Sequence, residues 1–248
     1  MIRFFVEPAE IVGGAVRLNI EDVGHVRALR LRPDEFFIVC DGAGTDYFCR
    51  LAETSDASAR SSHVPVAEII EARPSSGEPS VACDVYIAFA KGDRLDYAVQ
   101  KSVELGARDI MLFPSARCVS LPGDASKRCA RLQRIAMETA KQSGRGRVPV
   151  VSAIGSFEAA IAQAAGAEVP LFFYECEDEM HMKQALALHP FFSSVSIVTG
   201  PEGGFENHEA QLARSSGMLA VSLGPRILRC ETAPAAALAA LMYHTENL

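Results

Sequence analysis

Short apolar runs separated by Gly, Asp and Ser residues fill the N-terminal part of the chain. Runs of this length between turn-forming residues are typical of β-strands. One stretch, residues 21–29, has a helical pattern with acids in its first turn and arginines in its last, which suits the helix macrodipole. We therefore predict a small β-barrel with one helix. Its strands are expected at residues 2–6, 15–18, 36–40, 47–51 and 64–70.

The segment Arg-Pro-Ser-Ser-Gly-Glu-Pro at positions 73–79 is rich in residues that break helices and strands. Clusters of this kind mark loops and linkers, and the hydrophobic pattern changes across this one. We therefore place a domain boundary here, between a first domain over residues 1–73 and a second over residues 80–248.

Beyond the boundary, apolar runs of β-forming residues alternate with segments of helical period. This alternation is typical of βαβ units and predicts an α/β domain with a largely parallel sheet. Its strands are predicted at residues 81–89, 110–113, 148–152, 169–174, 195–199 and 218–221. Its helices are predicted at residues 94–105, 125–143, 157–165, 180–188, 206–215 and 232–243.

Composition narrows the class of protein. At 248 residues and 49% hydrophobic content, the chain can bury one large core or two smaller ones. No apolar stretch approaches the roughly 18–20 residues that span a bilayer, and the N-terminus lacks a signal-peptide layout, so we expect a cytoplasmic protein without membrane contact. The seven cysteines form no Cys-x-x-Cys pair and the six histidines show no ligand spacing, so no metal site is predicted.

Charge is unevenly distributed along the chain. The net charge of −7 argues against broad, non-specific binding of nucleic acid. From Lys127 to Arg147, however, the sequence has seven basic residues and only one acidic residue. Arg27, Arg30 and Arg32 form an earlier basic cluster. Either cluster alone could be a solvated helix face or a solubilising turn. Together they indicate a surface for an anionic partner.

Two glycine-bearing loops follow strand-like runs near the C-terminus. Gly200-Pro-Glu-Gly-Gly204 comes after residues 195–199, and Leu223-Gly-Pro-Arg-Ile-Leu-Arg-Cys-Glu-Thr-Ala233 lies 19 positions beyond it. Glycines let the main chain approach a ligand closely, and in open α/β sheets ligands bind beyond the carboxyl ends of strands. The patterns of phosphate-binding and dinucleotide-binding loops are absent. The loops predict a binding cleft; a tight strand-to-helix turn is the alternative for the first.

The chain resembles a known family, the bacterial 16S ribosomal RNA uracil-N3 methyltransferases of the RsmE type, in the SPOUT class. The order and spacing of several motifs carry the resemblance over nearly the whole chain. Cys230, where the family usually has a small hydroxyl residue, and Glu206-Asn-His before Glu209 depart from the pattern. The motifs are His25-Val-Arg-Ala-Leu-Arg30, Asp41-Gly-Ala-Gly44, Lys91-Gly-Asp-Arg94, Gln100-Lys-Ser-Val-Glu-Leu-Gly106, Glu138-Thr-Ala-Lys-Gln-Ser-Gly-Arg145, Gly200-Pro-Glu-Gly-Gly-Phe205 with Glu209, and Leu223 to Ala233.

The resemblance implies a fold and a cofactor. It predicts a homodimer in which a PUA-like β-barrel precedes a SPOUT α/β domain with a C-terminal trefoil knot. The knot loops would hold S-adenosylmethionine, with main-chain contacts to the adenine and glycines near the ribose and methionine portion. The matching segments are Phe173 to Glu175, Gly200 to Gly204 and Val221 to Ala233. The cofactor contacts expected within them are Tyr174, Glu175, Gly200, Pro201, Glu202, Gly203, Gly204, Val221, Leu223, Gly224, Ile227, Leu228, Thr232 and Ala233.

The implied target is N3 of a uridine in the 16S ribosomal RNA of the small ribosomal subunit. N3 carries a proton that must leave before it becomes a nucleophile, so a cation near the base oxygens and a proton acceptor are needed. Arg229, then Arg226, is the expected cation, because arginine stays charged. Glu202 and Glu231 are the candidate acceptors. Each has a structural alternative: Glu202 could brace the loop, and Glu231 could simply stabilise a helix N-terminus.

The resemblance and the basic clusters also predict contacts to RNA, and two rival functions stay open. Phosphate contacts position an RNA without specifying its sequence, so selectivity is expected to come from RNA shape and a splayed-out base. One rival is a SPOUT methyltransferase acting on transfer RNA or on another ribosomal nucleotide. The other is a non-catalytic RNA-binding factor for ribosome assembly. The predicted RNA contacts are Arg27, Arg30, Arg134, Lys141, Gln142 and Arg145.

Overall fold

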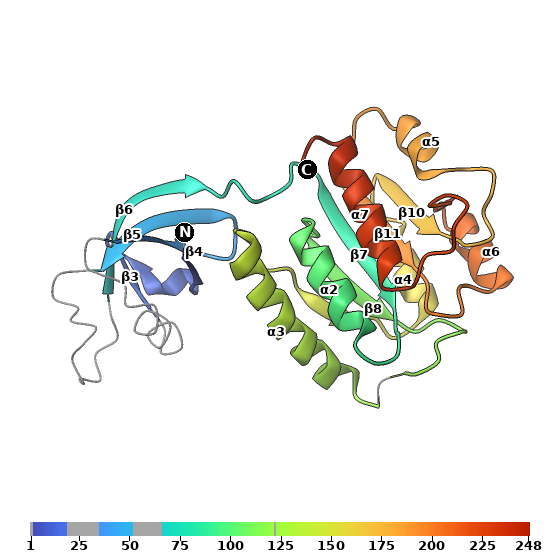
Figure 1. Ribbon diagram of the computed structural model, residues 1–248, viewed down its shortest axis with the longest axis horizontal. Helices are drawn as coiled ribbons and strands as arrows, with labels where there is room; N and C mark the ends of the chain where they lie inside the picture. The colour runs from blue at the N-terminus through green and yellow to red at the C-terminus, as the bar shows by residue number, and fades with distance from the viewer. Residues whose placement is uncertain (1, 19–34, 52–65, 122) are drawn as a thin grey trace. The chain divides into compact units, whose positions relative to one another are not determined.

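The computed structural model describes residues 2–18, 35–51, 66–121 and 123–248 (Figure 1). The chain divides into two compact units. The first comprises Met1–Glu78 and Ala140–Val148, and the second comprises Pro79–Thr139 and Pro149–Leu248. The helix predicted at residues 21–29 lies outside the described residues, and so do the predicted RNA contacts Arg27 and Arg30.

The first unit contains a six-stranded sheet in the order β1-β4-β5-β6-β3-β2. The pairing of β1 with β4 is parallel, and the other neighbours are antiparallel. Phe4 and Phe37 pack edge to face at 5.5 Å in its buried core. The predicted strands are all present, and β2 and the 3₁₀ turn η1 are additional. The elements are β1 (Arg3–Phe5), η1 (Pro8–Glu10), β2 (Ile11–Val12), β3 (Ala15–Arg17), β4 (Phe36–Cys40), β5 (Thr45–Leu51) and β6 (Val66–Pro74).

The second unit contains a six-stranded sheet in the order β12-β10-β11-β7-β8-β9, and all five pairings are parallel. The predicted parallel sheet is therefore confirmed. Strand β9 begins later than predicted, because Pro149 has no N–H to donate to a neighbouring strand. The strands are β7 (Ala82–Ala88), β8 (Asp109–Phe113), β9 (Val151–Ala153), β10 (Val169–Phe173), β11 (Ser194–Thr199) and β12 (Leu219–Val221).

Helices cover both faces of this sheet (Figure 1). Helices α2 and α7 pack together, and α7 lies on β7 and β11; α4 contacts the same two strands. Successive side chains of a strand point to opposite faces, so each face has its own core. Phe157 of α4, with Phe172 and Phe205, belongs to one of them. The helices are α2 (Arg94–Glu104), α3 (Ala125–Ser143, which passes from the second unit into the first), α4 (Phe157–Ala164), α5 (Met182–Ala187), α6 (Asn207–Ser215) and α7 (Thr232–His244).

Four loops meet at one edge of the parallel sheet. Strands β12, β10, β11 and β7 are neighbours and run in the same direction, so the segments that follow them leave from the same edge. These segments include the two glycine-bearing loops. Within the described ranges, no helix combines the length and the apolar character needed to cross a bilayer.

Candidate functional site

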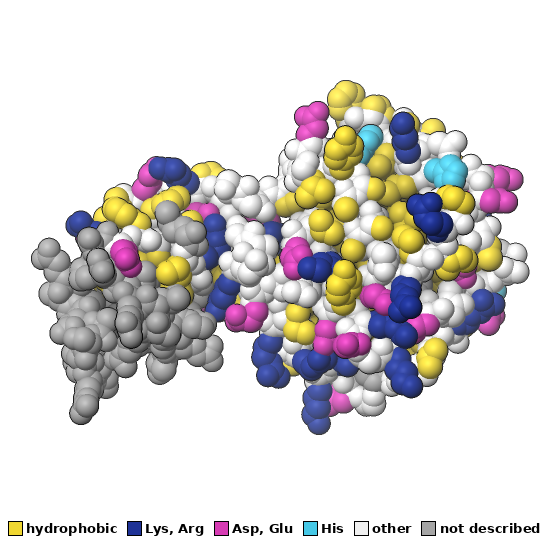
Figure 2. All heavy atoms as spheres, in the orientation of Figure 1, with side chains coloured by type: hydrophobic (Ala, Val, Ile, Leu, Met, Phe, Trp, Pro, Cys, Tyr) yellow, Lys and Arg dark blue, Asp and Glu magenta, His cyan; other side chains and the backbone are white. Residues whose placement is uncertain are grey.

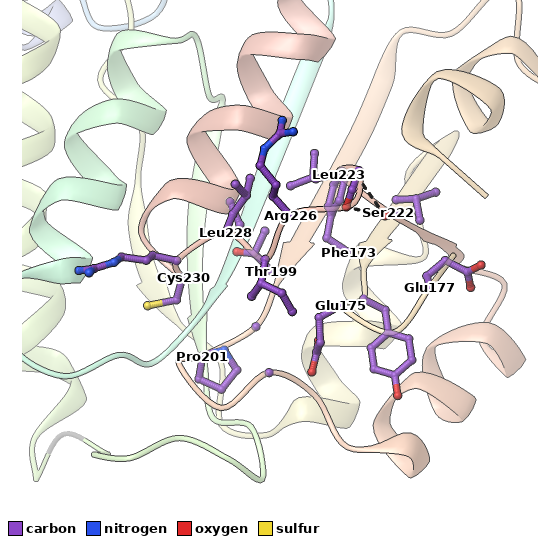
Figure 3. Close-up of a pocket in the computed structure, with 18 of the residues that line it drawn as sticks. Phe173, Glu175, Glu177, Thr199, Pro201, Ser222, Leu223, Arg226, Leu228 and Cys230 are labelled. Carbon is purple, nitrogen blue, oxygen red and sulfur yellow. Dashed lines mark hydrogen bonds between the residues drawn. The ribbon is translucent and has the colours of Figure 1, made fainter. Parts of the chain in front are cut away.

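A cavity of about 1050 Å³ opens at the carboxyl ends of β10, β11 and β12. Its walls come from segments that are distant in the sequence, namely residues 173–181, 199–204 and 221–233, together with Arg94 (Figure 3). This volume falls at the upper end of the range for small-molecule sites. The location is the one at which open α/β sheets bind ligands.

The first glycine-bearing loop is held in a tight turn. The N–H of Gly204 donates to the carbonyl oxygen of Pro201 at 3.0 Å, and Gly204 has a φ of +67°. A Cβ at Gly200 would lie 3.1 Å from Cε2 of the buried Phe205. The main chain therefore packs against its surroundings without side chains, as the sequence predicts for this loop.

Glu175 fixes the far end of that loop. Its Oε1 accepts the N–H of Phe205 at 3.0 Å. The Tyr174 hydroxyl beside it donates to Oδ1 of Asn207 at 2.6 Å, in the first turn of α6. The segment after β10 therefore fixes the position of the glycine loop and of the helix that follows it.

The second glycine-bearing loop runs from Ser222 into α7. Gly224, with a φ of +102°, donates its N–H to the hydroxyl of Ser222 at 3.1 Å. Beyond this turn, Arg226 and Ile227 are exposed, and the side chain of Arg229 is 82% exposed. Two cations, Arg226 and Arg229, are thus available to solvent among the residues that line the cavity.

A cluster of charged residues joins these loops. Arg94, at the first position of α2, forms a close ion pair with Oε1 of Glu202, and its Nε lies 3.8 Å from Oε2 of Glu231. Glu202 Oε1 also accepts the N–H of Lys91 at 2.8 Å. Burial acts to raise the pKa of Glu202, but the N–H of Lys91 and the guanidinium of Arg94 outweigh it and lower that pKa.

Cys230 lies against the same carboxylates. Its Sγ donates to Oε2 of Glu231 at 3.3 Å, and the residue is 8% exposed. Burial, followed by the hydrogen bond to Glu231, raises the pKa of this thiol to about 12. Cys230 is therefore a protonated thiol at neutral pH.

A second brace holds the glycine loop from outside. The carboxylate of Glu209, 2% exposed, accepts the Ser115 hydroxyl at 3.0 Å and the N–H of Ala116 at 2.9 Å on Oε1. Its other oxygen accepts the N–H of Glu206 at 2.8 Å, which completes a capping box on α6. Arg117 then donates to the carbonyl oxygen of Gly203 at 3.1 Å.

The predicted cofactor and catalytic residues converge on this cavity with one exception. Thr232 is exposed and does not line it, and its N–H donates to the carbonyl oxygen of Arg229 at 2.8 Å in the turn that begins α7. The sequence did not single out several other lining residues. Arg94 lay within a family-like motif, which was the available signal for it. The lining residues not predicted are Arg94, Glu177, Asp178, His181 and Thr199.

The predicted RNA contacts differ in how exposed their side chains are. Arg134 is exposed on α3, and Gln142 is exposed near its end. In contrast, the side chain of Arg145 is 3% exposed, and its Nε and Nη2 both donate to the Glu78 carboxylate at 2.8 Å. We therefore correct the interpretation of Arg145, because a buried guanidinium paired in this way is not available to a phosphate. Gly144, with a φ of +78°, follows the end of α3, and the N–H of Arg145 donates to the carbonyl oxygen of Ala140.

Basic side chains of the second unit gather over the N-terminal part of α3, along the lower edge of the unit in Figure 2. Several of them are paired. Arg131 forms a close two-pronged ion pair with Asp96, and Arg128 donates to the carbonyl oxygen of Gly92 at 2.6 Å. Among the residues that the structure describes, no group of three or more His, Cys, Asp or Glu side chains could hold a metal ion.

Comparison with known proteins identifies the family. Residues 77–242 match the family model described as RNA methyltransferase domain, and residues 18–60 match the RNA methyltransferase PUA domain. The chain is 32% identical to ribosomal RNA small subunit methyltransferase E of Bacillus subtilis, over 100% of this chain and 98% of the relative. It is 30% identical to the protein of that name from Mesomycoplasma hyopneumoniae, over 94% and 95%.

Solved structures agree. The crystal structure of the Neisseria gonorrhoeae ribosomal RNA small subunit methyltransferase E bound to S-adenosyl methionine matches with a TM-score of 0.84 and 34% identity, over 98% of both chains. A putative methyltransferase from Legionella pneumophila, in complex with bound SAM, matches with a TM-score of 0.80 and 25% identity. The predicted PUA-like domain and SPOUT α/β domain are thereby confirmed. With its fold, its loop-lined cavity and these relatives in agreement, the chain belongs to the ribosomal RNA small subunit methyltransferase E family.

Proposed function

We propose that this protein methylates the RNA of the small ribosomal subunit with S-adenosylmethionine. The observation that carries the proposal is the cavity at the strand ends, built from the two glycine-bearing loops. A relative that matches the chain over 98% of its length is bound to this cofactor. The RNA substrate is proposed from the names of the relatives.

The residues of the cavity fit such a cofactor. Gly200, Gly203 and Gly204 present main-chain groups without side chains, which suits close contact with a large polar ligand. Apolar walls for an adenine are available from Phe173, Leu223 and Leu228, all of which line the cavity. When bound, S-adenosylmethionine supplies a methyl group activated by the positive charge on sulfur.

We assign the target atom as N3 of a uridine, as the resemblance implies. Arg229 is the cation that stabilises the deprotonated base, with Arg226 second; the exposure of both at the cavity supports this role. Glu231 is the first candidate to accept the N3 proton. Glu202 is second, because one of its oxygens already accepts from Lys91 and Arg94. Catalysis then depends on positioning the uridine in a site that is formed before it arrives.

RNA is proposed to bind through separate surfaces of the two units. The first domain, residues 1–73, takes the role of RNA-binding barrel, supported by its match to a PUA domain of RNA methyltransferases. Arg134, Lys141 and Gln142 provide contacts along α3, and Arg27 and Arg30 remain predicted contacts. Phosphate contacts of this kind position the RNA, and the cavity selects the base.

A homodimer is proposed through α7. This helix is apolar around its circumference, yet Ala236 and Ala239 are only partly buried, and Ala240 and Tyr243 are exposed. A helix that is apolar on all sides is normally covered on all sides. Apolar side chains also gather over this part of the surface in Figure 2. A second copy of the chain would cover them, and sedimentation equilibrium measures the stoichiometry.

A C-terminal trefoil knot and a cytoplasmic location are also part of the proposal. Strand β12 pairs with β10 although β11 lies between them in the chain, an order that supports a C-terminal segment passing across an earlier loop. A ribosomal substrate implies action in the cytoplasm.

The test uses purified protein, S-adenosylmethionine and small ribosomal subunits that lack the modification, with a transfer RNA pool in parallel. A methyl group on N3 blocks the pairing edge, so reverse transcription stops there. The expected result is a single new stop at a uridine of the small-subunit RNA. A stop in transfer RNA only would reassign the substrate. No stop in either RNA, with cofactor binding demonstrated, would favour a non-catalytic assembly factor.

A further inference from the structure

Arg94 is the one residue from outside the two glycine-bearing loops that contacts a carboxylate in each of them among the described ion pairs. Its guanidinium forms a close ion pair with Glu202 in the first loop and lies 3.8 Å from Glu231 in the second. Arg94 begins α2, which follows β7, and α2 packs against α7. The contact therefore reaches both loops from a rigid element of the sheet and its helices.

Glu202 depends on this contact. Its side chain is 18% exposed, and its Oε1 accepts from Arg94 and from the N–H of Lys91. Its Oε2 is buried and has no hydrogen-bond partner among the described residues. A carboxylate removed from water is costly unless a cation is paired with it. Loss of the Arg94 charge would therefore leave Glu202 favouring a more solvated position, and the glycine loop would move with it.

We propose that Arg94 is a positioning residue for methyl transfer, which holds the two cavity loops in register by pairing with Glu202 and Glu231. The part of this inference that concerns methyl transfer rests on the proposed function. Its structural content, that the cofactor cavity needs Arg94 for its shape, is independent of the RNA substrate.

The test measures S-adenosylhomocysteine affinity by calorimetry, which needs no RNA, and then kcat and KM on small ribosomal subunits. For Arg94→Ala we expect the Kd for S-adenosylhomocysteine and the KM for S-adenosylmethionine to rise about ten- to one-hundredfold, the range that loss of a charge-assisted hydrogen bond produces. KM for the RNA should stay unchanged. Arg94→Lys, which keeps the charge but not the fork of donors, should recover part of the affinity.

A matched control is available in the same unit. Arg108 pairs closely with Asp84, and these side chains are 41% and 16% exposed, against 39% and 18% for Arg94 and Glu202. Arg108→Ala breaks an ion pair of similar exposure away from the cavity, so it should leave the Kd for S-adenosylhomocysteine within about twofold of the parent protein. If Arg94 acts through Glu202, the double variant Arg94→Ala/Glu202→Gln should bind no more weakly than Arg94→Ala.

Two results would overturn the inference: Arg94→Ala binding S-adenosylhomocysteine as tightly as Arg108→Ala does, or fully additive losses in the double variant. If Arg94→Ala does not fold, Glu202→Gln and Arg94→Lys decide the question by the same affinities. A parent protein that binds S-adenosylhomocysteine but methylates no RNA would refute the proposed function alone. The affinities would still show whether Arg94 shapes the cavity.

Discussion

The Glu175 carboxylate occupies the space that a side chain at Gly204 would need. A Cβ built at Gly204 would lie 1.8 Å from Oε1 of Glu175, the atom that accepts the N–H of Phe205. Gly204 also has a φ of +67°, which is unfavourable for residues with a Cβ. The turn therefore depends on glycine for two independent reasons, its backbone angle and its contact with Glu175.

The variant Gly204→Ala should lose cofactor binding. Gly217→Ala is the matched control, because Gly217 has a φ of +89° but nothing within 4 Å of its Cβ position. Both variants should lose about 1 kcal/mol or more of stability from the backbone angle. Only Gly204→Ala should also displace Glu175 and weaken S-adenosylhomocysteine binding by calorimetry. Equal affinities for the two variants would contradict the role of that contact.

Glu209→Ala should destabilise the protein strongly. The carboxylate is buried and accepts hydrogen bonds from Ser115, Ala116 and Glu206, so its removal takes the partner from the buried Ser115 hydroxyl and from two part-buried N–H groups. We expect a loss of about 2–3 kcal/mol in the free energy of unfolding, measured by urea denaturation. Glu158→Ala, at an exposed first-turn position of α4, should cost clearly less, because water screens its interaction with the helix N-terminus. Losses of the same size would show that Glu209 acts only on its helix N-terminus.

The contribution of Glu202 to stability should depend on pH. Its pKa in the folded protein lies below the ordinary value of 4.5, so its ionised form favours folding at pH values above 4.5. That contribution is lost as the pH falls through the lowered pKa. The difference in free energy of unfolding between the parent protein and Glu202→Gln should therefore be full at neutral pH and shrink below about pH 4.5. A difference that stays constant down to pH 3 would contradict the pairing with Arg94.

Variants of Arg145 and Arg134 should have different effects, the first on the stability of the protein and the second on RNA binding. Arg145→Ala breaks the pair between the buried Arg145 guanidinium and the part-buried Glu78 carboxylate and should cost about 2–3 kcal/mol in unfolding experiments. Arg134→Ala removes an exposed charge; it should keep stability within about 0.5 kcal/mol and lower the salt dependence of RNA binding by about one counterion. Filter binding at several salt concentrations measures the second effect. A normal salt slope for Arg134→Ala would remove it from the RNA surface.

Cys230 should resist alkylation in the folded protein. Its thiol is 8% exposed and has a pKa raised to about 12, whereas the reactive species is the thiolate. The exposed Cys176 should therefore react with iodoacetamide first at about pH 8, as followed by peptide mass spectrometry. In denaturant the two residues should react at similar rates. Equal rates in the folded protein would show that the second loop opens readily.

Local patterns account for most of what the sequence could predict. The apolar runs and helical periods placed nearly every element of both units, because strands and helices are specified by neighbouring residues. The glycines that follow β11 likewise indicated a backbone-lined loop. The cofactor and the target, however, came from resemblance to a family and not from these patterns.

Contacts between distant residues were beyond the sequence. Nothing near Arg94 indicates that its partner is Glu202, more than one hundred positions away, or that Glu209 would be buried under Ser115. For Arg145, the sequence predicted a contact with RNA that the structure does not support. It stands in a basic run that reads as an anion-binding surface, but its partner is Glu78, in the segment that the sequence marks as a linker.

The strand order of the second unit has a consequence for synthesis. Strand β7 occupies the interior of the sheet, between β8 and β11, yet its partner β11 is made more than one hundred residues later. While the chain emerges from a ribosome, one edge of β7 stays unpaired until β11 has been translated. Long-range pairing of this kind makes folding slow and leaves apolar edges open to aggregation. An enzyme proposed to modify ribosomes thus spends a long stretch of its own synthesis on one with its central strand only partly paired.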